Sequence, residues 1–263
     1  MEKIQVPTLA ELKEKNEKAD LLFWVGCAGS FDDRAKKITK AMVKILNHCK
    51  ISFAVLGKEE TCTGDPAKRA GNDFLFQLQA LQNIKTLEDY GVKHIITACP
   101  HCFNTLKNEY PALGGNYKVQ HHSEFLQELI DQNKLILKEG GTFKGQKITF
   151  HDPCYLGRGN DIYEAPRTII EKLDAELVEM KRCKSKGFCC GAGGAQMFKE
   201  AEKGNQEINI NRSEEALALK PKIIATGCPF CNTMMSDGVK HFEQEKNVQV
   251  LDLAELIANA SDL

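Results

Sequence analysis

The sequence predicts an α/β fold made of two tandem duplicated domains, each a mostly parallel sheet flanked by helices, with cysteine loops at the carboxyl ends of the strands. Three observations predict it: short β-rich runs alternate with helical patterns, cysteines follow those runs, and the whole arrangement occurs twice. A chain of 263 residues is long enough for two such domains, each with its own core.

The first copy begins with an apolar run that ends close to a cysteine. After it, apolar residues recur at helical spacing at Ile38, Met42 and Ile45. Residues 72–90 also have a helical pattern, and Gly91 suits the left-handed position just past a helix end. Four runs are predicted as strands: 21–25, 51–56, 94–98 and 117–122. This alternation of strand and helix is typical of a parallel sheet covered by helices.

The second copy repeats the pattern after Lys138–Gly145, which has three glycines and no apolar periodicity and is predicted as a linker. Its predicted strands lie within 147–154, 175–180, 222–227 and 248–253. At the front, Thr8 and Glu11 have capping-box spacing, which predicts a short helix over 8–18. The expected divisions are an N-terminal extension (1–20), a first domain (21–140) and a second domain (146–263).

Nine of the eleven cysteines form two sets with matching spacing, and Cys49 and Cys183 lie outside them. The flanking residues repeat as well, since HIITACPHC (94–102) matches KIIATGCPFC (222–231). The first set is Cys27, Cys62, Cys99 and Cys102, and the second is Cys154, Cys189, Cys190, Cys228 and Cys231. Because each cysteine loop follows a predicted strand, we expect the thiols of each set to meet in one pocket.

Composition limits the partners and the compartment. Thirty-five basic and 36 acidic residues give a formal charge of −1, so neither a nucleic acid nor an anionic membrane surface is an implied partner. The first 20 residues lack the apolar segment of a signal peptide, and Leu21–Val25 is too short to span a bilayer. A cytoplasmic location is therefore expected, where clustered thiols hold metals or react more often than they form disulfides.

Thiolates are soft ligands that select zinc, copper(I) or iron–sulfur clusters. A tetrahedral zinc site needs only four ligands, so the five thiols of the second set favour a multi-iron centre. A zinc-stabilised, non-redox interaction module stays open as an alternative. A third alternative is a thiol–disulfide enzyme that uses Cys99-Pro-His-Cys102 directly, but it leaves the other cysteines unexplained.

Several motifs resemble the cysteine-rich CCG domain found in the B-type and D-type subunits of heterodisulfide reductases and in related iron–sulfur oxidoreductases. The resemblance extends from about Leu21 onward. In the second copy it rests on HDPC (151–154), FCCGAGG (188–194) and GCPFC (227–231). In the first copy it rests on ETCTGDPAKRAGN (60–72) and ACPHC (98–102).

The resemblance implies two iron–sulfur clusters. The second set would bind a [4Fe–4S] cluster, either a cubane or the unusual non-cubane kind known in that family, with the adjacent Cys189 and Cys190 serving different irons. The first set departs from the family pattern, because Thr63 stands where the second cysteine of the pair is expected. With four thiols, it is expected to hold a [4Fe–4S] cubane.

The resemblance also implies an electron-transfer subunit of an oxidoreductase complex. Electrons would pass between a flavin or ferredoxin-type partner and a quinone or a thiol/disulfide acceptor, with the membrane reached only through a partner. ETCTGDPAKRAGN is most similar to members associated with electron-transfer flavoprotein and quinone reduction. Iron–sulfur subunits of the lactate-utilisation type are a further alternative, and no catalytic residue is singled out.

Four features beside the cysteines leave their roles open. His151 and Asp152 either relay protons or orient a ligand, or His151 is simply packed at a strand end. His101 either donates to a cluster sulfur or faces solvent. Gly191-Ala-Gly-Gly194 superficially resembles a dinucleotide fingerprint, but no predicted strand runs directly into it.

Overall fold

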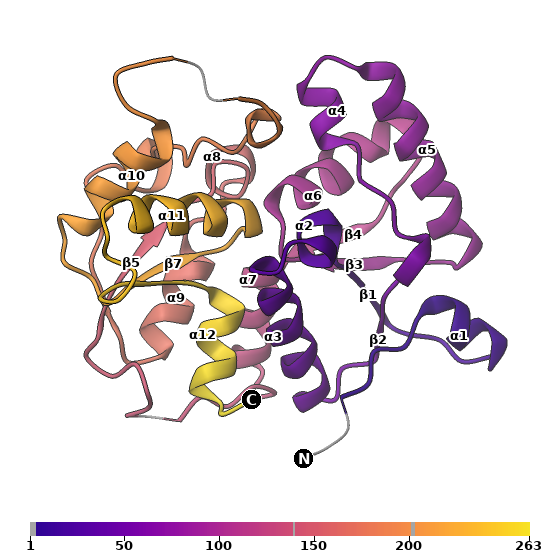
Figure 1. The fold of residues 1–263 in the computed structure, drawn as a ribbon. Coiled ribbons are helices and arrows are strands. Elements are labelled where there is room, and N and C mark those ends of the chain that lie inside the picture. The colour runs from indigo at the N-terminus through magenta and orange to yellow at the C-terminus, as the bar shows by residue number, and fades with distance from the viewer. Residues whose placement is uncertain (1–3, 139, 201–202) are drawn as a thin grey trace.

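The computed structural model describes residues 4–138, 140–200 and 203–263, which form two four-stranded parallel sheets, one in each half of the chain (Figure 1). The first sheet has the order β2-β1-β3-β4 and the second has the order β6-β5-β7-β8. Their strands are β1 (Leu21–Trp24), β2 (Phe53–Ala54), β3 (His94–Thr97), β4 (Lys118–His121), β5 (Lys147–His151), β6 (Glu176–Leu177), β7 (Ile223–Thr226) and β8 (Gln249–Asp252). Each strand lies within a predicted run, and the predicted fold class is confirmed.

The two sheets repeat the same register at their carboxyl ends. Trp24 of β1 pairs with Thr97 of β3, and His151 of β5 pairs with Thr226 of β7. Each threonine lies two residues before the first cysteine of a Cys-x-x-Cys motif. The duplication in the sequence is therefore also a duplication of backbone pairing.

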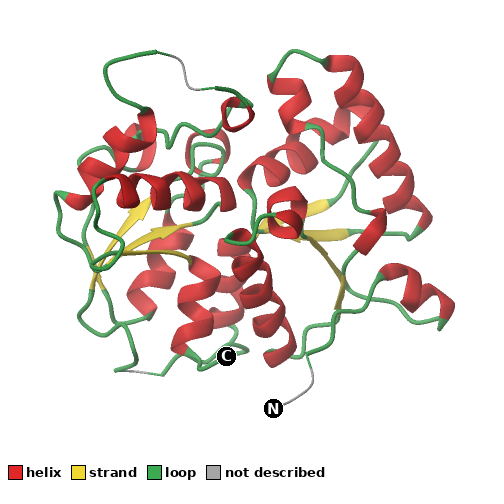
Figure 2. Ribbon diagram, viewed as in Figure 1, coloured by secondary structure: helices red, strands yellow, loops and turns green. Residues whose placement is uncertain are grey.

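Helices cover both faces of each sheet, as parallel strands require for their crossover connections (Figure 2). In the first half they are α1 (Leu9–Glu14), α2 (Gly26–Phe31), α3 (Ala35–His48), η1 (Gly57–Glu59), α4 (Asp65–Arg69), α5 (Asp73–Asp89), α6 (Pro100–Asn104), η2 (Thr105–Glu109), η3 (Tyr110–Leu113) and α7 (His122–Asp131). In the second half they are α8 (Gly157–Asn160), α9 (Glu164–Lys172), η4 (Lys184–Lys186), η5 (Gln196–Phe198), α10 (Ile208–Leu217), α11 (Pro229–His241) and α12 (Leu253–Ala260).

One hydrophobic core joins the two halves. Helices α3 and α7 of the first half pack against α9 and α12 of the second, in the middle of the molecule between the sheets (Figure 1). Buried side chains of both halves meet there, including Phe125, Phe150 and Ile257. The outer face of each sheet has a separate apolar layer, which contains Trp24 in the first half and Met235 in the second.

Polar side chains also cross between the halves. The Arg34 guanidinium donates to both carboxylate oxygens of Glu255, each at 2.8 Å. At the ends of β4 and β8, the buried His122 Nε2 lies 2.8 Å from Asp252 Oδ1. Because these buried and partly buried polar groups satisfy one another only when the halves are together, they help to set how the halves fit.

The N-terminal extension docks on the first half. Thr8 N-caps α1 in the predicted capping box, and the Leu9 N–H donates to the Val55 carbonyl at 2.9 Å. Leu9 is buried in the outer core layer of the first half. The helix is shorter than predicted because the chain turns left-handed at Asn16, whose φ is +54°.

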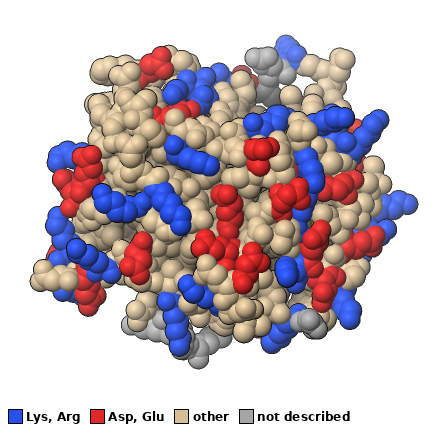
Figure 3. All heavy atoms as spheres, turned by 180° about the vertical axis from the view of Figure 1, so that it is seen from behind, with Lys and Arg blue, Asp and Glu red and all other residues tan. Residues whose placement is uncertain are grey.

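The outer surface has mixed charge. Figure 3 shows lysines and arginines interspersed with aspartates and glutamates over the back of the molecule, in agreement with a formal charge of −1. Within the described ranges, no helix combines the length and the apolar character that crossing a bilayer requires.

The shared core predicts that the two halves unfold together. Ile257→Ala removes a fully buried side chain of the second half and should lower the free energy of unfolding by about 2–5 kcal/mol. The single tryptophan, Trp24, reports on the first half, so its fluorescence transition in urea should shift as far as the circular dichroism transition. Leu81→Ala, at a half-exposed position of α5, is the control. A Trp24 transition that stays in place would show that the halves unfold independently.

Candidate metal centres

Each half gathers its cysteines at the carboxyl ends of its strands, the edge at which open parallel sheets bind ligands. Cys27 lies in the first turn of α2 after β1, and Cys99 is the N-cap of α6 after β3. Cys154 follows β5, and Cys228 is the N-cap of α11 after β7. The other members of the two sets are Cys102 in α6, Cys231 in α11, and Cys62, Cys189 and Cys190 in loops. All eleven cysteines are free thiols.

The four thiols of the first set share one neighbourhood. The hydrogen bond with the Cys27 thiol is the main reason that the pKa of Cys62 is lowered to about 7. The Cys99 thiol is the main reason that the pKa of Cys102 is raised, and Cys27 and Cys62 add to that effect. These couplings show that the four thiols of the first set lie near one another.

The five thiols of the second set form a connected group. The Cys154 thiol is the main cause of the lowered pKa of Cys189. Cys190 Sγ lies 3.4 Å from Cys231 Sγ, and Cys231 also interacts with Cys228. Cys189 and Cys190 interact with each other, and each has a further partner of its own, Cys154 for Cys189 and Cys231 for Cys190.

The two sets meet where the halves face each other. The hydrogen bond with Cys102 is the largest reason that the pKa of Cys99 lies well below its ordinary value, and the next largest is the bond with Cys228 of the second half. The His101 ring packs near this contact, with its centroid 4.6 Å from that of Tyr155 and 5.6 Å from that of Phe230. His101 is buried rather than facing solvent.

Thr63 takes the place in the first half that Cys190 takes in the second. Thr63 Oγ1 lies 3.9 Å from Cys102 Sγ, as Cys190 Sγ lies 3.4 Å from Cys231 Sγ. Both side chains are buried. The two sites thus differ in the side-chain group at one position, a hydroxyl in place of a soft thiol, and not in the path of the loop.

A glycine with positive φ follows each of these positions. The φ of Gly64 is +91° and that of Gly191 is +93°, values that other residues rarely adopt. Their backbone N–H groups donate to the sulfurs of Cys62 at 3.4 Å and of Cys189 at 3.2 Å. A Cβ on Gly64 would lie 2.8 Å from Phe76 Cδ2, so the loop also needs glycine for lack of space.

Two polar side chains that the sequence patterns did not single out hold the first set in place. The Glu60 carboxylate accepts from the N–H groups of Val25 and Gly26, in the turn that enters α2. Asn83 Nδ2 donates to the Cys62 carbonyl at 2.9 Å. The signal for Asn83 is a polar residue on the otherwise apolar inner face of α5, whereas Glu60 has no such signal.

Asp152 holds the second set in place. Its two carboxylate oxygens accept from the Arg167 guanidinium at 2.8 and 3.0 Å, and one of them also accepts from the Lys184 N–H at 2.7 Å. Arg167 makes a second pair of hydrogen bonds with Glu179. This network fixes the backbone between β5 and Cys154.

His151 lies directly beside the second set. A ring nitrogen of His151 and the sulfurs of Cys190 and Cys231 all lie within 4.8 Å of one another. Its Nδ1 accepts a hydrogen bond from Arg212 Nε at 3.0 Å. Burial, and after it the charge of Arg212, lowers the pKa of His151 to about 3, so the ring is neutral.

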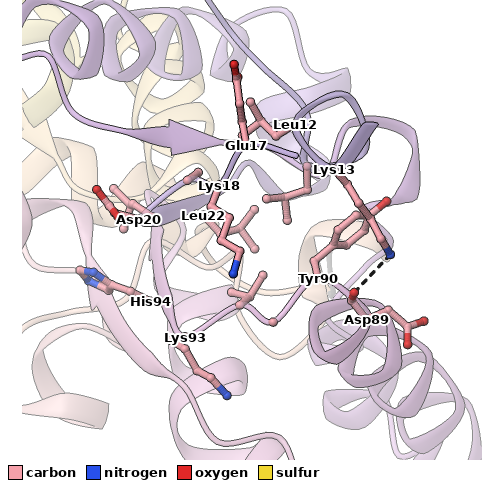
Figure 4. A pocket seen from close by; sticks show the side chains of 15 residues that line it. Leu12, Lys13, Glu17, Lys18, Asp20, Leu22, Asp89, Tyr90, Lys93 and His94 are labelled. Atoms are coloured by element: carbon pink, nitrogen blue, oxygen red, sulfur yellow. Dashed lines mark hydrogen bonds between the residues drawn. The ribbon is translucent and has the colours of Figure 1, made fainter. Parts of the chain in front are cut away.

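A cavity of about 410 Å³ lies at the opposite end of the first sheet (Figure 4). It is lined by Leu22 at the start of β1, His94 at the start of β3, and residues of α1, where Lys13 Nζ donates to the Asp89 carbonyl at 3.4 Å. Its lining residues include no cysteine. The cavity is therefore separate from the thiol sets, which lie at the carboxyl ends of the strands.

A family model described as the cysteine-rich domain, CCG, matches residues 21–107 and 148–236. The chain belongs to this family. The two matched segments contain all nine cysteines of the two sets, so the duplication is a duplication of the CCG domain. The thiol-rich domain supports iron–sulfur chemistry in this chain.

The curated relatives are larger redox proteins. The chain is 46% identical over 97% of its length to the "Probable iron-sulfur-binding oxidoreductase FadF" of Bacillus subtilis. It is 42% identical over 95% of its length to the "EtfAB:quinone oxidoreductase" of Syntrophomonas wolfei. It is 32% identical over 94% of its length to one subunit of the dihydromethanophenazine:CoB–CoM heterodisulfide reductase of Methanosarcina barkeri. The chain spans 36% of the first two relatives and 60% of the third.

Replacing Gly64, which follows Thr63, should lower the free energy of unfolding for two reasons, its positive φ and the lack of space for a Cβ. Gly64→Ala should cost about 1–2 kcal/mol for its positive φ and about 1–3 kcal/mol more for the contact with Phe76. Gly71→Ala is the matched control, because Gly71 has φ of +84° but nothing within 4 Å of its Cβ position. Urea unfolding of the two variants, free of metal, measures the difference. Equal losses would contradict the packing argument.

Proposed function

We propose that this chain is an iron–sulfur electron-transfer unit of an oxidoreductase. The observation that carries the proposal is the meeting of two thiol sets at the carboxyl ends of both sheets, with Cys99 of one set in contact with Cys228 of the other. Adjacent centres suit the passage of electrons from one to the other, which a purely structural pair of metal sites does not require. Family membership and the names of the relatives support the same function.

Two [4Fe–4S] clusters fit the ligand atoms. Four cysteine thiols are the usual ligand set of a cubane, which suits Cys27, Cys62, Cys99 and Cys102. The second set, of Cys154, Cys189, Cys190, Cys228 and Cys231, has one thiol more, which suits a non-cubane cluster. In that set each of the two adjacent thiols has a further partner of its own besides its neighbour, which suits one loop that supplies ligands to two irons of the same cluster.

The proposed partners are a flavoprotein or ferredoxin-type donor and a quinone or disulfide acceptor. Relatives named for quinone and heterodisulfide reduction support these classes. A reduced flavin would release two electrons and two protons, and the two thiol sets would hold the centres that carry the electrons. A quinone would take both electrons with two protons to become a quinol, or a disulfide would take them with two protons to become two thiols. We place this exchange in the cytoplasm, with any membrane contact made through the partner.

Metal analysis tests the proposal against the zinc alternative. Anaerobically purified protein should contain about eight irons and a similar amount of acid-labile sulfide per chain. Cys27→Ser and Cys154→Ser remove equivalent ligands and should each abolish one electron paramagnetic resonance signal while leaving the other. Cys49→Ser, outside both sets, should keep both. Zinc without sulfide would overturn the redox function.

The proposed difference between the clusters rests on Thr63. Thr63→Cys adds a thiol where Cys190 stands in the second half, so the first centre should acquire the resonance spectrum of the second without loss of iron. Cys190→Thr is the reverse change and should give the second centre the spectrum of the first. If both spectra are unchanged in both variants, the fifth thiol does not determine cluster type.

A further inference from the structure

His151 presents a hydrogen-bond donor to the second thiol set. A guanidinium can only donate, so the Nδ1 that accepts from Arg212 Nε carries no proton. Since an imidazole ring has a proton on at least one nitrogen, that proton lies on Nε2. Arg212 is itself held by the carbonyl of Arg182 at 2.9 Å and by the Glu215 carboxylate at 2.8 Å, so it locks this tautomer.

The Nε2–H group of His151 is buried and has no acceptor among the described residues. A buried donor without an acceptor costs about 1–3 kcal/mol, so native structures rarely keep one without a function. Sulfur atoms lie close by, since a ring nitrogen of His151 is within 4.8 Å of the sulfurs of both Cys190 and Cys231. A protonated nitrogen can donate to sulfur but cannot bind iron.

Trp24 stands at the equivalent position in the first half. It lies three residues before Cys27, as His151 lies three residues before Cys154, and both are the last residues of the central strands β1 and β5. Trp24 is fully buried in the same apolar layer as Cys99. Its indole N–H also has no acceptor among the described residues, and an indole nitrogen can only donate.

We propose, on the basis of the proposed function, that His151 Nε2–H and Trp24 Nε1–H each donate a hydrogen bond to a sulfur of the cluster in their own half. They are positioning residues and not ligands. A donor to sulfur stabilises the reduced cluster, which carries more negative charge, and so raises its reduction potential. Because the donors at the two equivalent positions differ, the reduction potential of each centre is shifted by a different side chain.

Redox titration of the purified, cluster-loaded chain tests the proposal. His151→Leu should keep the iron and sulfide content and should disfavour reduction of the second centre about tenfold, which is about 59 mV for one electron. Trp24→Phe should do the same to the first centre alone, so each variant is the control of the other. Loss of iron in His151→Leu would make His151 a ligand, and an unchanged potential would make it structural; either result overturns the proposal.

One measurement on the unmodified protein remains decisive if a variant does not fold. Nitrogen-15 spectra of histidine-labelled chain free of metal should show His151 protonated at Nε2. Protonation at Nδ1 would overturn the inference, whereas absence of iron from the wild-type chain would overturn the proposed function itself.

Discussion

The packing of α3 and α7 against α9 and α12 is the constraint on which the rest of the structure depends. Each sheet alone would place its cysteine loops at its own carboxyl edge, since that follows from parallel strands. Only the shared core turns those two edges toward each other, so that Cys99 and Cys228 come into contact. Without this core there would be two separate thiol sites and no route between them.

Hydrogen bonds from neighbouring side chains hold the backbone segments that carry the thiols. Glu60 holds the turn before α2, and Asn83 holds the carbonyl of Cys62. Asp152 and Arg167 hold the strand end before Cys154 in the second half. Preorganised ligands reduce the rearrangement that accompanies a change in charge, so such support suits a site that gains and loses electrons.

The strands and the cysteine loops could be predicted because their signals are local: β-rich runs, glycines and repeated cysteine spacing. The contact between Cys99 and Cys228 could not be predicted, since the pattern of one domain does not say how two copies pack. The hydrogen bond between His151 and Arg212 could not be predicted either, because the two residues lie 61 positions apart in the chain. The local pattern also predicted too long a first helix, because it did not reveal the left-handed turn at Asn16.

The helix contacts between the halves imply an approximate two-fold axis. Helix α3 corresponds to α9 and α7 to α12, and the contact of α3 with α12 is matched by that of α7 with α9. The equivalent residues Cys99 and Cys228 touch each other, as residues near such an axis do. The two halves of the single chain thus pack against each other as the two subunits of a symmetric dimer would. A true homodimer would have two identical sites, whereas covalent fusion allows Thr63 to differ from Cys190 and Trp24 from His151, so the two thiol sites can differ in chemistry.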